Sequence, residues 1–317
     1  MHSANRKSYK LYMSILVKGL TKKFGNQIAV NNLHFSVNPG EIVGFLGPNG
    51  AGKSTTMKML CCYLTPTEGS AEIDGFDIIN NPLEVKSRVG YLAEQNPLYD
   101  DMYVKEYLAF VAGIHKIQQP NQRIKEVIQL TGLEKEQSKI IGSLSKGYKQ
   151  RVGLAQAIIH DPKVLILDEP TSGLDMNQLV GIRQLILEMG KEKTVIFSSH
   201  IMQEVQALCS RVVIINDGIL VADDPIELLQ SRMTGQGKII VDFAESEINV
   251  NAFEKLAGVI EVTRNSNSLH ILINENIDIK PEIFRLAVSL GLTIIEMRSE
   301  KINMESVFRK LTKSGKE

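Results

Sequence analysis

Residues 47–55 read Gly47-Pro48-Asn49-Gly50-Ala51-Gly52-Lys53-Ser54-Thr55, and this stretch decides the fold. It fits the spacing G-x-x-x-x-G-K-S/T, with a strand-like apolar run at 42–46 before it and a helical pattern after it. That context favours a phosphate-binding loop over a plain glycine-rich turn. In such a loop, backbone amides and the positive end of the helix bind phosphate oxygens. Lys53 would add a positive charge near the β- and γ-phosphates, and Ser54 could ligate Mg²⁺.

A second stretch delivers two carboxylates at the end of a buried strand. Residues 164–169 read Val164-Leu165-Ile166-Leu167-Asp168-Glu169. Because open α/β sheets bind ligands outside the carboxyl ends of their strands, we expect both carboxylates beside the phosphate loop. Asp168 is predicted to hold Mg²⁺ through its water shell, and Glu169 to polarise an attacking water as general base. Taken without the phosphate loop, the same residues would also fit a solvated acidic turn.

A third stretch, residues 144–151, identifies the family. It reads Leu144-Ser145-Lys146-Gly147-Tyr148-Lys149-Gln150-Arg151 and resembles the signature loop of ABC ATPases. The resemblance implies a loop that opens a helix and, across a head-to-tail dimer, presents Ser145 and Gly147 to the γ-phosphate bound by the other subunit. Family members usually have Gly-Gly-Gln after the serine, so Lys146 and Tyr148 depart from the pattern. By itself, Ser145 would simply mark the start of a helix.

The remaining elements of the family pattern follow in order over residues 15–230. Ser172-Gly173-Leu174-Asp175 resembles the loop that crosses the dimer interface, although Met176 stands where a proline is common. His200 resembles the switch histidine that contacts the γ-phosphate, whereas a lone histidine at a strand end is more often a polar surface residue. Phe24 matches the aromatic residue that stacks on adenine, and a core aromatic is the alternative.

The loop that senses the γ-phosphate is the least well defined part of the resemblance. It reads Tyr91-Leu92-Ala93-Glu94-Gln95-Asn96-Pro97-Leu98. Counting back from Leu98 places Glu94 at the usual glutamine position. We expect Gln95 to be the neutral Mg²⁺ ligand and keep Glu94 beside it, because a carboxylate would add negative charge near the phosphates.

Length and composition indicate an ordinary globular chain of two domains. At 317 residues the chain exceeds the size at which one hydrophobic core usually stops growing. It has 36 basic and 36 acidic residues, so no charge excess favours binding to nucleic acid or to anionic lipid. Its longest apolar runs have the length of strands and are far shorter than the roughly 20 residues of a membrane-spanning helix. The first twelve residues lack the apolar core of a secretory signal.

The order of patterns predicts the domain boundaries. Residues 1–13 are expected to be a disordered extension, with the start of translation open between Met1 and Met13. Residues 14–230 are predicted to form the ABC ATP-binding domain, an α/β fold with a helical subdomain at about 82–160. After a polar linker, residues 238–317 show the order βαββαβ, the ferredoxin-like arrangement, followed by one more helix. Residues 304–311 in this segment resemble the end of the C-terminal domain carried by ATP-binding subunits of ABC-2-type exporters. We expect this domain to be regulatory or to support the dimer.

The three cysteines give no sign of a disulfide framework or of a metal site. Cys61 and Cys62 are adjacent within an apolar helical pattern, and Cys209 is far away in the sequence. We therefore expect all three to be small buried hydrophobic residues.

Longer stretches suggest a subfamily. Residues 96–99, 102–108, 144–148 and 200–205 are together similar to those of gliding-motility-associated ABC transporter ATP-binding subunits. This resemblance implies an ATPase that binds ATP and Mg²⁺ and powers an ABC-2-type exporter with separate transmembrane permease subunits. It also implies a second ATP-binding subunit, identical or paralogous, and a cytoplasmic location on the inner face of the inner membrane. Gliding motility does not follow from these motifs, because near relatives would share them.

A soluble ABC ATPase acting in translation, DNA repair or cofactor assembly is the competing reading. A single cassette, a short helical insert and no sustained heptads argue against its main forms. Residues 99–107 lie where such transporters receive the coupling helix of the membrane subunit, but the aromatic side chains there would also suit core packing.

Overall fold

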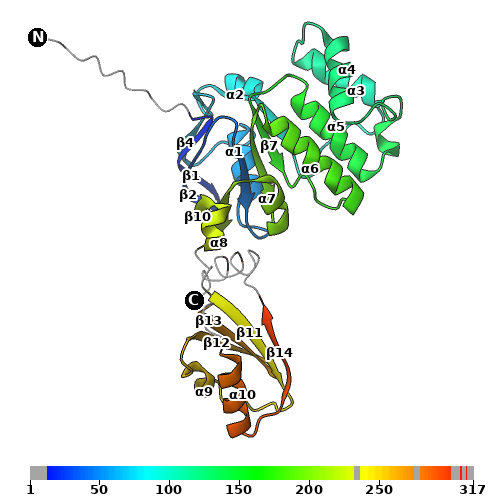
Figure 1. Ribbon diagram of the computed structural model, residues 1–317. Coiled ribbons are helices and arrows are strands. Elements are labelled where there is room, and N and C mark those ends of the chain that lie inside the picture. The colour runs from blue at the N-terminus through cyan, green and yellow to red at the C-terminus, as the bar shows by residue number, and fades with distance from the viewer. Residues whose placement is uncertain (1–12, 232–235, 275–278, 301–307, 309–311, 313–317) are drawn as a thin grey trace, which may run out of the picture. The chain divides into compact units, whose positions relative to one another are not determined.

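The computed structural model describes residues 13–231, 236–274, 279–300, 308 and 312 (Figure 1). The chain divides between Asp224 and Pro225 into two compact units. The sequence places this division later, in the polar stretch after residue 230. It falls earlier, at Pro225, which has no backbone N–H to donate and is the last residue of strand β10 (Ile219–Pro225).

A six-stranded sheet forms the centre of the first unit, in the order β10-β9-β3-β8-β7-β6. The pairs β3·β8, β3·β9, β7·β8 and β6·β7 are parallel. Strands β7 and β8 are buried along their whole length, which explains why they read as continuous apolar runs. The buried strand predicted before Asp168 is confirmed as β7 (Val164–Asp168), and the apolar runs at 194–197 and 212–215 form β8 (Thr194–Ser199) and β9 (Arg211–Asn216).

Strand β6 (Val89–Leu92) corrects the prediction of a helical section that begins at residue 82. It follows directly on helix α2 (Pro82–Arg88) and pairs with β7 at the edge of the sheet. Four residues are too few to show a strand period beside a helical pattern. Gly90 permits the packing, because a Cβ atom there would overlap the carbonyl oxygen of Ala157.

A four-stranded antiparallel sheet lies in the same unit, in the order β2-β1-β4-β5. One hydrophobic core joins its strands to the six-stranded sheet and to helix α1. Phe35 on β2 and Phe45 on β3 meet there, with ring centroids 5.6 Å apart. The core therefore fixes the strand that precedes the phosphate loop. The elements are β1 (Ile15–Phe24), β2 (Gln27–Val37), β3 (Ile42–Leu46), α1 (Lys53–Leu60), β4 (Glu68–Ile73) and β5 (Phe76–Asp77).

Helices α3 to α6 gather on the side of the first unit away from β1, β2 and β4 (Figure 1). In α4 the apolar residues Ile124, Val127 and Ile128 recur at helical spacing and are buried, whereas Leu130 is exposed. This group positions helix α5 behind the predicted signature loop. The elements are α3 (Val104–Ile114), α4 (Pro120–Leu130), α5 (Lys146–Ile158), α6 (Met176–Gly190) and α7 (Met202–Leu208), with a short 3-10 turn at Ile141–Ser143.

The second unit contains an antiparallel sheet in the order β12-β13-β11-β14. Two helices alternate with its strands, and side chains such as Phe253 and Ile283 from the helices share one core with Val241 and Ile271 of the sheet. Apolar burial on a sheet face thus gives this unit a core of its own. The elements are α8 (Ile226–Ser231), β11 (Gln236–Phe243), α9 (Val250–Glu254), β12 (Val259–Asn265), β13 (Ser268–Asn274), α10 (Lys280–Ser289) and β14 (Ile294–Glu300).

Some predictions fall outside the described residues, namely the extension at 1–12 and most of the closing segment 304–311. Within the described part of the chain, no helix has both the length and the apolar character to cross a membrane. The cysteines are free thiols there. Cys61 is buried, and its burial raises the pKa of the thiol, whereas the predicted full burial is wrong for Cys62 and Cys209, which are half-buried.

Candidate functional site

The predicted phosphate loop connects strand β3 to helix α1, as its motif requires. Gly52 immediately precedes the helix with φ 102°, a conformation that side chains rarely adopt. A Cβ atom at Gly52 would also lie 2.5 Å from the carbonyl oxygen of Ala29. Glycine at this position therefore allows the loop to turn tightly against β2.

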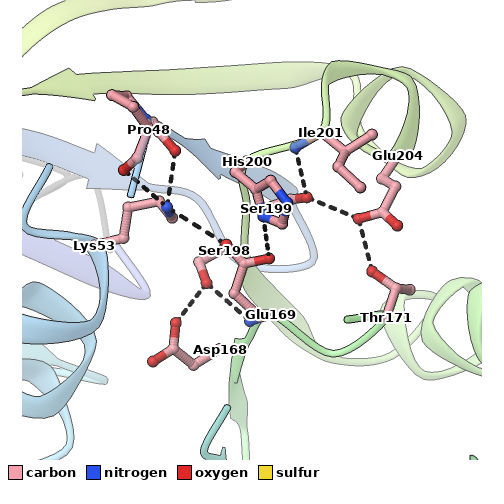
Figure 2. Close-up of polar contacts among 11 residues, drawn as sticks. Pro48, Lys53, Asp168, Glu169, Thr171, Ser198, Ser199, His200, Ile201 and Glu204 are labelled. Atoms are coloured by element: carbon pink, nitrogen blue, oxygen red, sulfur yellow. Dashed lines mark hydrogen bonds and ion pairs between the residues drawn. The ribbon is translucent and has the colours of Figure 1, made fainter. Parts of the chain in front are cut away.

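Lys53 is buried under the loop, with 6% of its surface exposed. Its ammonium group donates to the carbonyl oxygens of Gly47 at 2.8 Å and Pro48 at 3.2 Å. It also lies 3.4 Å from Oε1 of Glu169 (Figure 2). A cation is thereby held between the loop and the end of strand β7.

The two predicted carboxylates end strand β7, and Ser198 on the neighbouring strand positions both. Asp168 pairs with Ser198 in the register of β7 and β8. The Ser198 hydroxyl donates to Oδ1 of Asp168 at 2.6 Å and accepts from the backbone N–H of Glu169 at 2.9 Å. Glu169 has φ 48°, an unfavourable conformation for a residue with a side chain. The hydrogen bond from Ser198 helps to hold this conformation.

His200 follows strand β8 and contacts Glu169. Its Nδ1 lies 2.9 Å from Oε2 of Glu169 (Figure 2). Because a carboxylate only accepts, Nδ1 carries the proton of this bond. The His200 side chain is 42% exposed, while that of Glu169 is 7% exposed. A buried carboxylate is thus bonded to a histidine that faces solvent, beside a buried lysine.

These residues border one cavity of about 670 Å³. It brings together the loop, the carboxylate, the histidine and Phe24 from the end of β1. Phe24 is 48% exposed and has the Lys22 ammonium 5.3 Å from its ring centroid, so it is not a core aromatic. The cavity is lined by Phe24, Gln27, Ile28, Ala29, Asn49, Gly50, Gly52, Lys53, Ser54, Thr55, Glu94, Glu169, Ser172, His200 and Asp217.

The two candidates for the sensing residue are both exposed. Glu94 lines the cavity, whereas Gln95 is not among the lining residues. Asp168 is also absent from this lining, because it lies beneath the surface with 1% exposure. Gly47 and Pro48 contribute their carbonyl groups to Lys53, and Ala51 is buried behind the loop.

The predicted signature residues lie at a different place on the first unit. Ser145 caps α5 by accepting from the backbone N–H of Tyr148 at 3.5 Å, and Asp175 caps α6 by accepting from that of Gln178 at 2.9 Å. The Gln178 amide reaches Ser145 Oγ at 3.4 Å, which joins the two helix starts. Gly147 and Asp175 border a second cavity of about 620 Å³. Within one chain, then, Ser145, Gly147 and Asp175 do not border the cavity of the phosphate loop.

Four polar residues of the site region are not predicted from the sequence. Ser198 joins the Asp168 carboxylate to the backbone N–H of Glu169, and Glu204 accepts hydrogen bonds from Thr171 at 2.6 Å and from Ser199 at 2.7 Å. The only sequence signal is the pair of serines that precedes His200 on an otherwise apolar strand. Their partners depend on the pairing of β7 with β8, which the sequence does not reveal.

Comparison with known proteins places this site in context. A family model described as ABC transporter matches residues 30–172. The bacitracin transport ATP-binding protein BcrA of Bacillus licheniformis is 34% identical over 96% of this chain and 99% of its own length. The ABC transporter ATP-binding protein NatA of Bacillus subtilis is 39% identical over 63% of this chain and 83% of its own.

A solved structure shares the fold. It is a dimeric ATP-binding cassette in a post-hydrolysis state, bound to ADP and Pi. It covers 67% of this chain and 98% of its own length, with a TM-score of 0.61 and 26% identity. The similarity therefore extends from the sequence to the arrangement of the cassette.

Proposed function

This chain belongs to the ABC transporter ATP-binding proteins, and we propose that it hydrolyses ATP with Glu169, His200 and Lys53 to power an ABC-2-type exporter. One observation supports this assignment more than any other. The Glu169 carboxylate lies between the Lys53 ammonium at 3.4 Å and the His200 imidazole at 2.9 Å, at the wall of the loop cavity. A base and a cation in this arrangement would suit the terminal phosphate of ATP.

The nucleotide would bind in the loop cavity. Residues 47–55 would surround the phosphates with backbone amides, and the start of α1 would add its positive end. Lys53 would exchange its contacts with the Gly47 and Pro48 carbonyl oxygens for phosphate oxygens. The exposed ring of Phe24 would stack on the adenine at the other end of the cavity.

Hydrolysis then needs a water molecule activated beside the γ-phosphate. Glu169 would accept a proton from this water as the new oxygen–phosphorus bond forms and the bond to the β-phosphate oxygen breaks. Its contact with His200 Nδ1 orients the carboxylate, and the exposed imidazole would contact the γ-phosphate. Lys53 would stabilise the negative charge on the phosphate oxygens as the bond breaks.

The residues at the loop also fit a Mg²⁺ ion that binds with the nucleotide. The Ser54 hydroxyl would supply an oxygen ligand, Asp168 would hold the ion through its water shell, and Glu94 or Gln95 would complete the set. Among the described residues there is no group of three or more His, Cys, Asp and Glu that could hold a metal. The oxygen groups of Asp168, Ser54 and Glu94 or Gln95 suit Mg²⁺, which takes one or two carboxylates together with substrate phosphates and water. The ion would neutralise charge on the phosphate oxygens.

Replacing Glu94 by Ala should disturb Mg²⁺ dependence more than replacing Gln95 by Ala. Glu94 lines the cavity and Gln95 does not, so only the first change removes a group from the cavity wall. We expect the Mg²⁺ concentration for half-maximal hydrolysis to rise by about 10-fold for Glu94→Ala. A titration of hydrolysis with Mg²⁺ measures this for both variants. A larger shift for Gln95→Ala would reverse the assignment, and equal, small shifts would remove both residues from the site.

A second copy of the cassette would complete each site. Ser145, Gly147 and Asp175 do not line the loop cavity of their own chain. Gly147 and Asp175 border a separate cavity at the starts of α5 and α6, and Ser145 is joined to Gln178 beside it. In a head-to-tail pair they would face the nucleotide held by the other chain. Lys146 and Tyr148 depart from the usual signature, so the backbone at Gly147 would make the main contact. The pair would close on two ATP molecules and reopen after hydrolysis.

Separate transmembrane permease chains would transmit this closure to the exported molecule. Tyr99 and Tyr103, after the predicted sensing loop, are about half exposed, while Tyr107 is buried. Residues 99–103 are therefore available to a coupling helix of the permease. The chain would then lie on the cytoplasmic face of the inner membrane. Its relative BcrA is named for bacitracin transport, and bacitracin is one candidate for the exported molecule.

Two finer assignments belong to the same proposal. The second unit, with its strand order β12-β13-β11-β14 and two helices, would be a ferredoxin-like domain that regulates or supports the dimer. The resemblance to gliding-motility-associated subunits rests on residues 96–99, 102–108, 144–148 and 200–205 and stays a prediction.

Isolation of the native complex tests the link to a permease. The tagged full chain would be purified from detergent-solubilised membranes and from the soluble fraction, and the accompanying proteins identified by mass spectrometry. We expect an integral membrane protein at a stoichiometry comparable to the chain. Recovery in the soluble fraction alone, without a membrane protein, would instead support an ABC ATPase that works without a channel.

A further inference from the structure

Glu204, in the first turn of helix α7, is a buried carboxylate that the proposed hydrolysis does not use. It is 2% exposed. Its Oε2 atom accepts two hydrogen bonds, from Thr171 Oγ1 at 2.6 Å and from Ser199 Oγ at 2.7 Å (Figure 2). Both hydroxyls are buried as well. A buried carboxylate is costly without such partners, so its place in the fold is defined by these two contacts.

The carboxylate does not act as an ordinary helix cap. A Glu at the third position of a helix commonly bonds back to the N–H of the capping residue, which here is Ile201. That N–H instead donates to Ser199 Oγ at 3.0 Å. Ser199 thus satisfies the start of α7, and Glu204 is left to join two segments that are far apart in the sequence.

Those two segments carry the groups proposed for hydrolysis. Thr171 follows Glu169 by two residues, and Ser199 immediately precedes His200. The contact of His200 with Glu169 at 2.9 Å closes a ring that runs from Glu169 through Thr171, Glu204 and Ser199 to His200. Within this ring the spacing of the two catalytic segments is set by the Glu204 carboxylate.

The ring of contacts helps to hold the backbone conformation of Glu169. With φ 48° it has an unfavourable conformation that persists only if its surroundings hold it. Ser198 holds the N–H of Glu169 at 2.9 Å. On the other side of Glu169, the nearest buried side-chain anchor is the bond from Thr171 to Glu204. Losing that anchor would free the backbone to relax and would lengthen the contact with His200.

We propose that Glu204 is a positioning residue for ATP hydrolysis, which holds the Glu169 segment and the His200 segment at the distance that their contact requires. This inference rests on the proposed roles of Glu169 and His200. It concerns the rate of the chemical step, since Glu204 is not among the residues that line the loop cavity. ATP binding should therefore be largely independent of it.

Substitutions at both ends of the Thr171–Glu204 bond test the proposal in the full chain. Because a misplacement of about 1 Å can lower a rate by about 10²-fold, we expect Glu204→Ala to lower kcat by about 10- to 100-fold. Thr171→Val keeps the shape and loses one hydroxyl, so we expect a loss of about 10-fold. The KM for ATP should stay within about twofold in both. Glu188→Ala, which removes an exposed glutamate from α6, is the matched control and should leave kcat unchanged.

A double-mutant cycle distinguishes positioning from general destabilisation. If Glu204 and Thr171 act through His200, then adding either change to His200→Ala should lower kcat by no more than about threefold further. If Glu204→Ala does not fold, the cycle of Thr171→Val with His200→Ala tests the proposal by itself. Losses that multiply in the cycle, or an unchanged kcat in Thr171→Val, would overturn the proposal. A wild-type chain that does not hydrolyse ATP would instead count against the proposed function itself.

Discussion

Exchanging Glu169 for Gln is expected to lower kcat of ATP hydrolysis by about 10²- to 10⁴-fold, the contribution of a general base. The amide keeps the size of the side chain but cannot accept a proton from water. Glu169 is 7% exposed and bonded to His200, so no solvent carboxylate can replace it. ATP should still bind, because the loop at 47–55 is unchanged. Phosphate release under saturating ATP and Mg²⁺ measures the rate, and an equilibrium titration measures nucleotide affinity.

A Glu→Gln exchange at an exposed position controls for the loss of a carboxylate outside the site. Glu192→Gln alters an exposed glutamate just after α6 and should hydrolyse ATP at the wild-type rate. If Glu169→Gln retains more than about a tenth of the wild-type kcat, another group supplies the base and the assignment of Glu169 is wrong.

Exchanging Lys53 for Met should abolish hydrolysis and weaken ATP binding together. Met preserves the buried aliphatic stem but removes the charge that contacts the Gly47 and Pro48 carbonyl oxygens and Glu169. Loss of one donor to the reacting phosphate lowers kcat by about 10²- to 10³-fold. Because the same ammonium attracts the phosphates in the ground state, affinity should fall as well. Fluorescent-nucleotide titration and phosphate release measure the two effects separately.

Lys58 offers a control on the same helix. It is exposed one turn further along α1, and Lys58→Met should change neither affinity nor rate. Nucleotide affinity that is unchanged in Lys53→Met would contradict the placement of the phosphates at the loop.

The parts of the fold that could be predicted are those with a strong local signal. Strands β7, β8 and β9 are buried on both faces, so each reads as a continuous apolar run. Strand β6 was missed because its four residues follow α2 without a break, and only their pairing with β7 makes them a strand. Burial of all three cysteines was predicted from local composition, which cannot show that Cys62 and Cys209 lie at the margin of a core.

The residues of the site likewise fall into those with a local sequence signal and those without one. The phosphate loop and the carboxylates of β7 could be placed from sequence because their motifs are contiguous and each follows a strand. Ser198, Thr171 and Glu204 could not, since they matter through contacts between segments about 30 residues apart. Those contacts exist only once β8 pairs with β7 in its observed register. The exposure of Phe24 likewise settles a choice between core packing and a ligand surface that composition leaves open.

The measurement that tests the account most directly is the mass of the Glu169→Gln chain in solution with ATP and Mg²⁺. Ser145, Gly147 and Asp175 do not line the loop cavity of their own chain, so the proposed site would need two chains to be complete. With hydrolysis blocked, the closed pair should accumulate. Light scattering should then give twice the mass of the 35.3 kDa chain with ATP and the single mass without nucleotide. A variant that binds ATP yet keeps the mass of one chain would contradict the shared site.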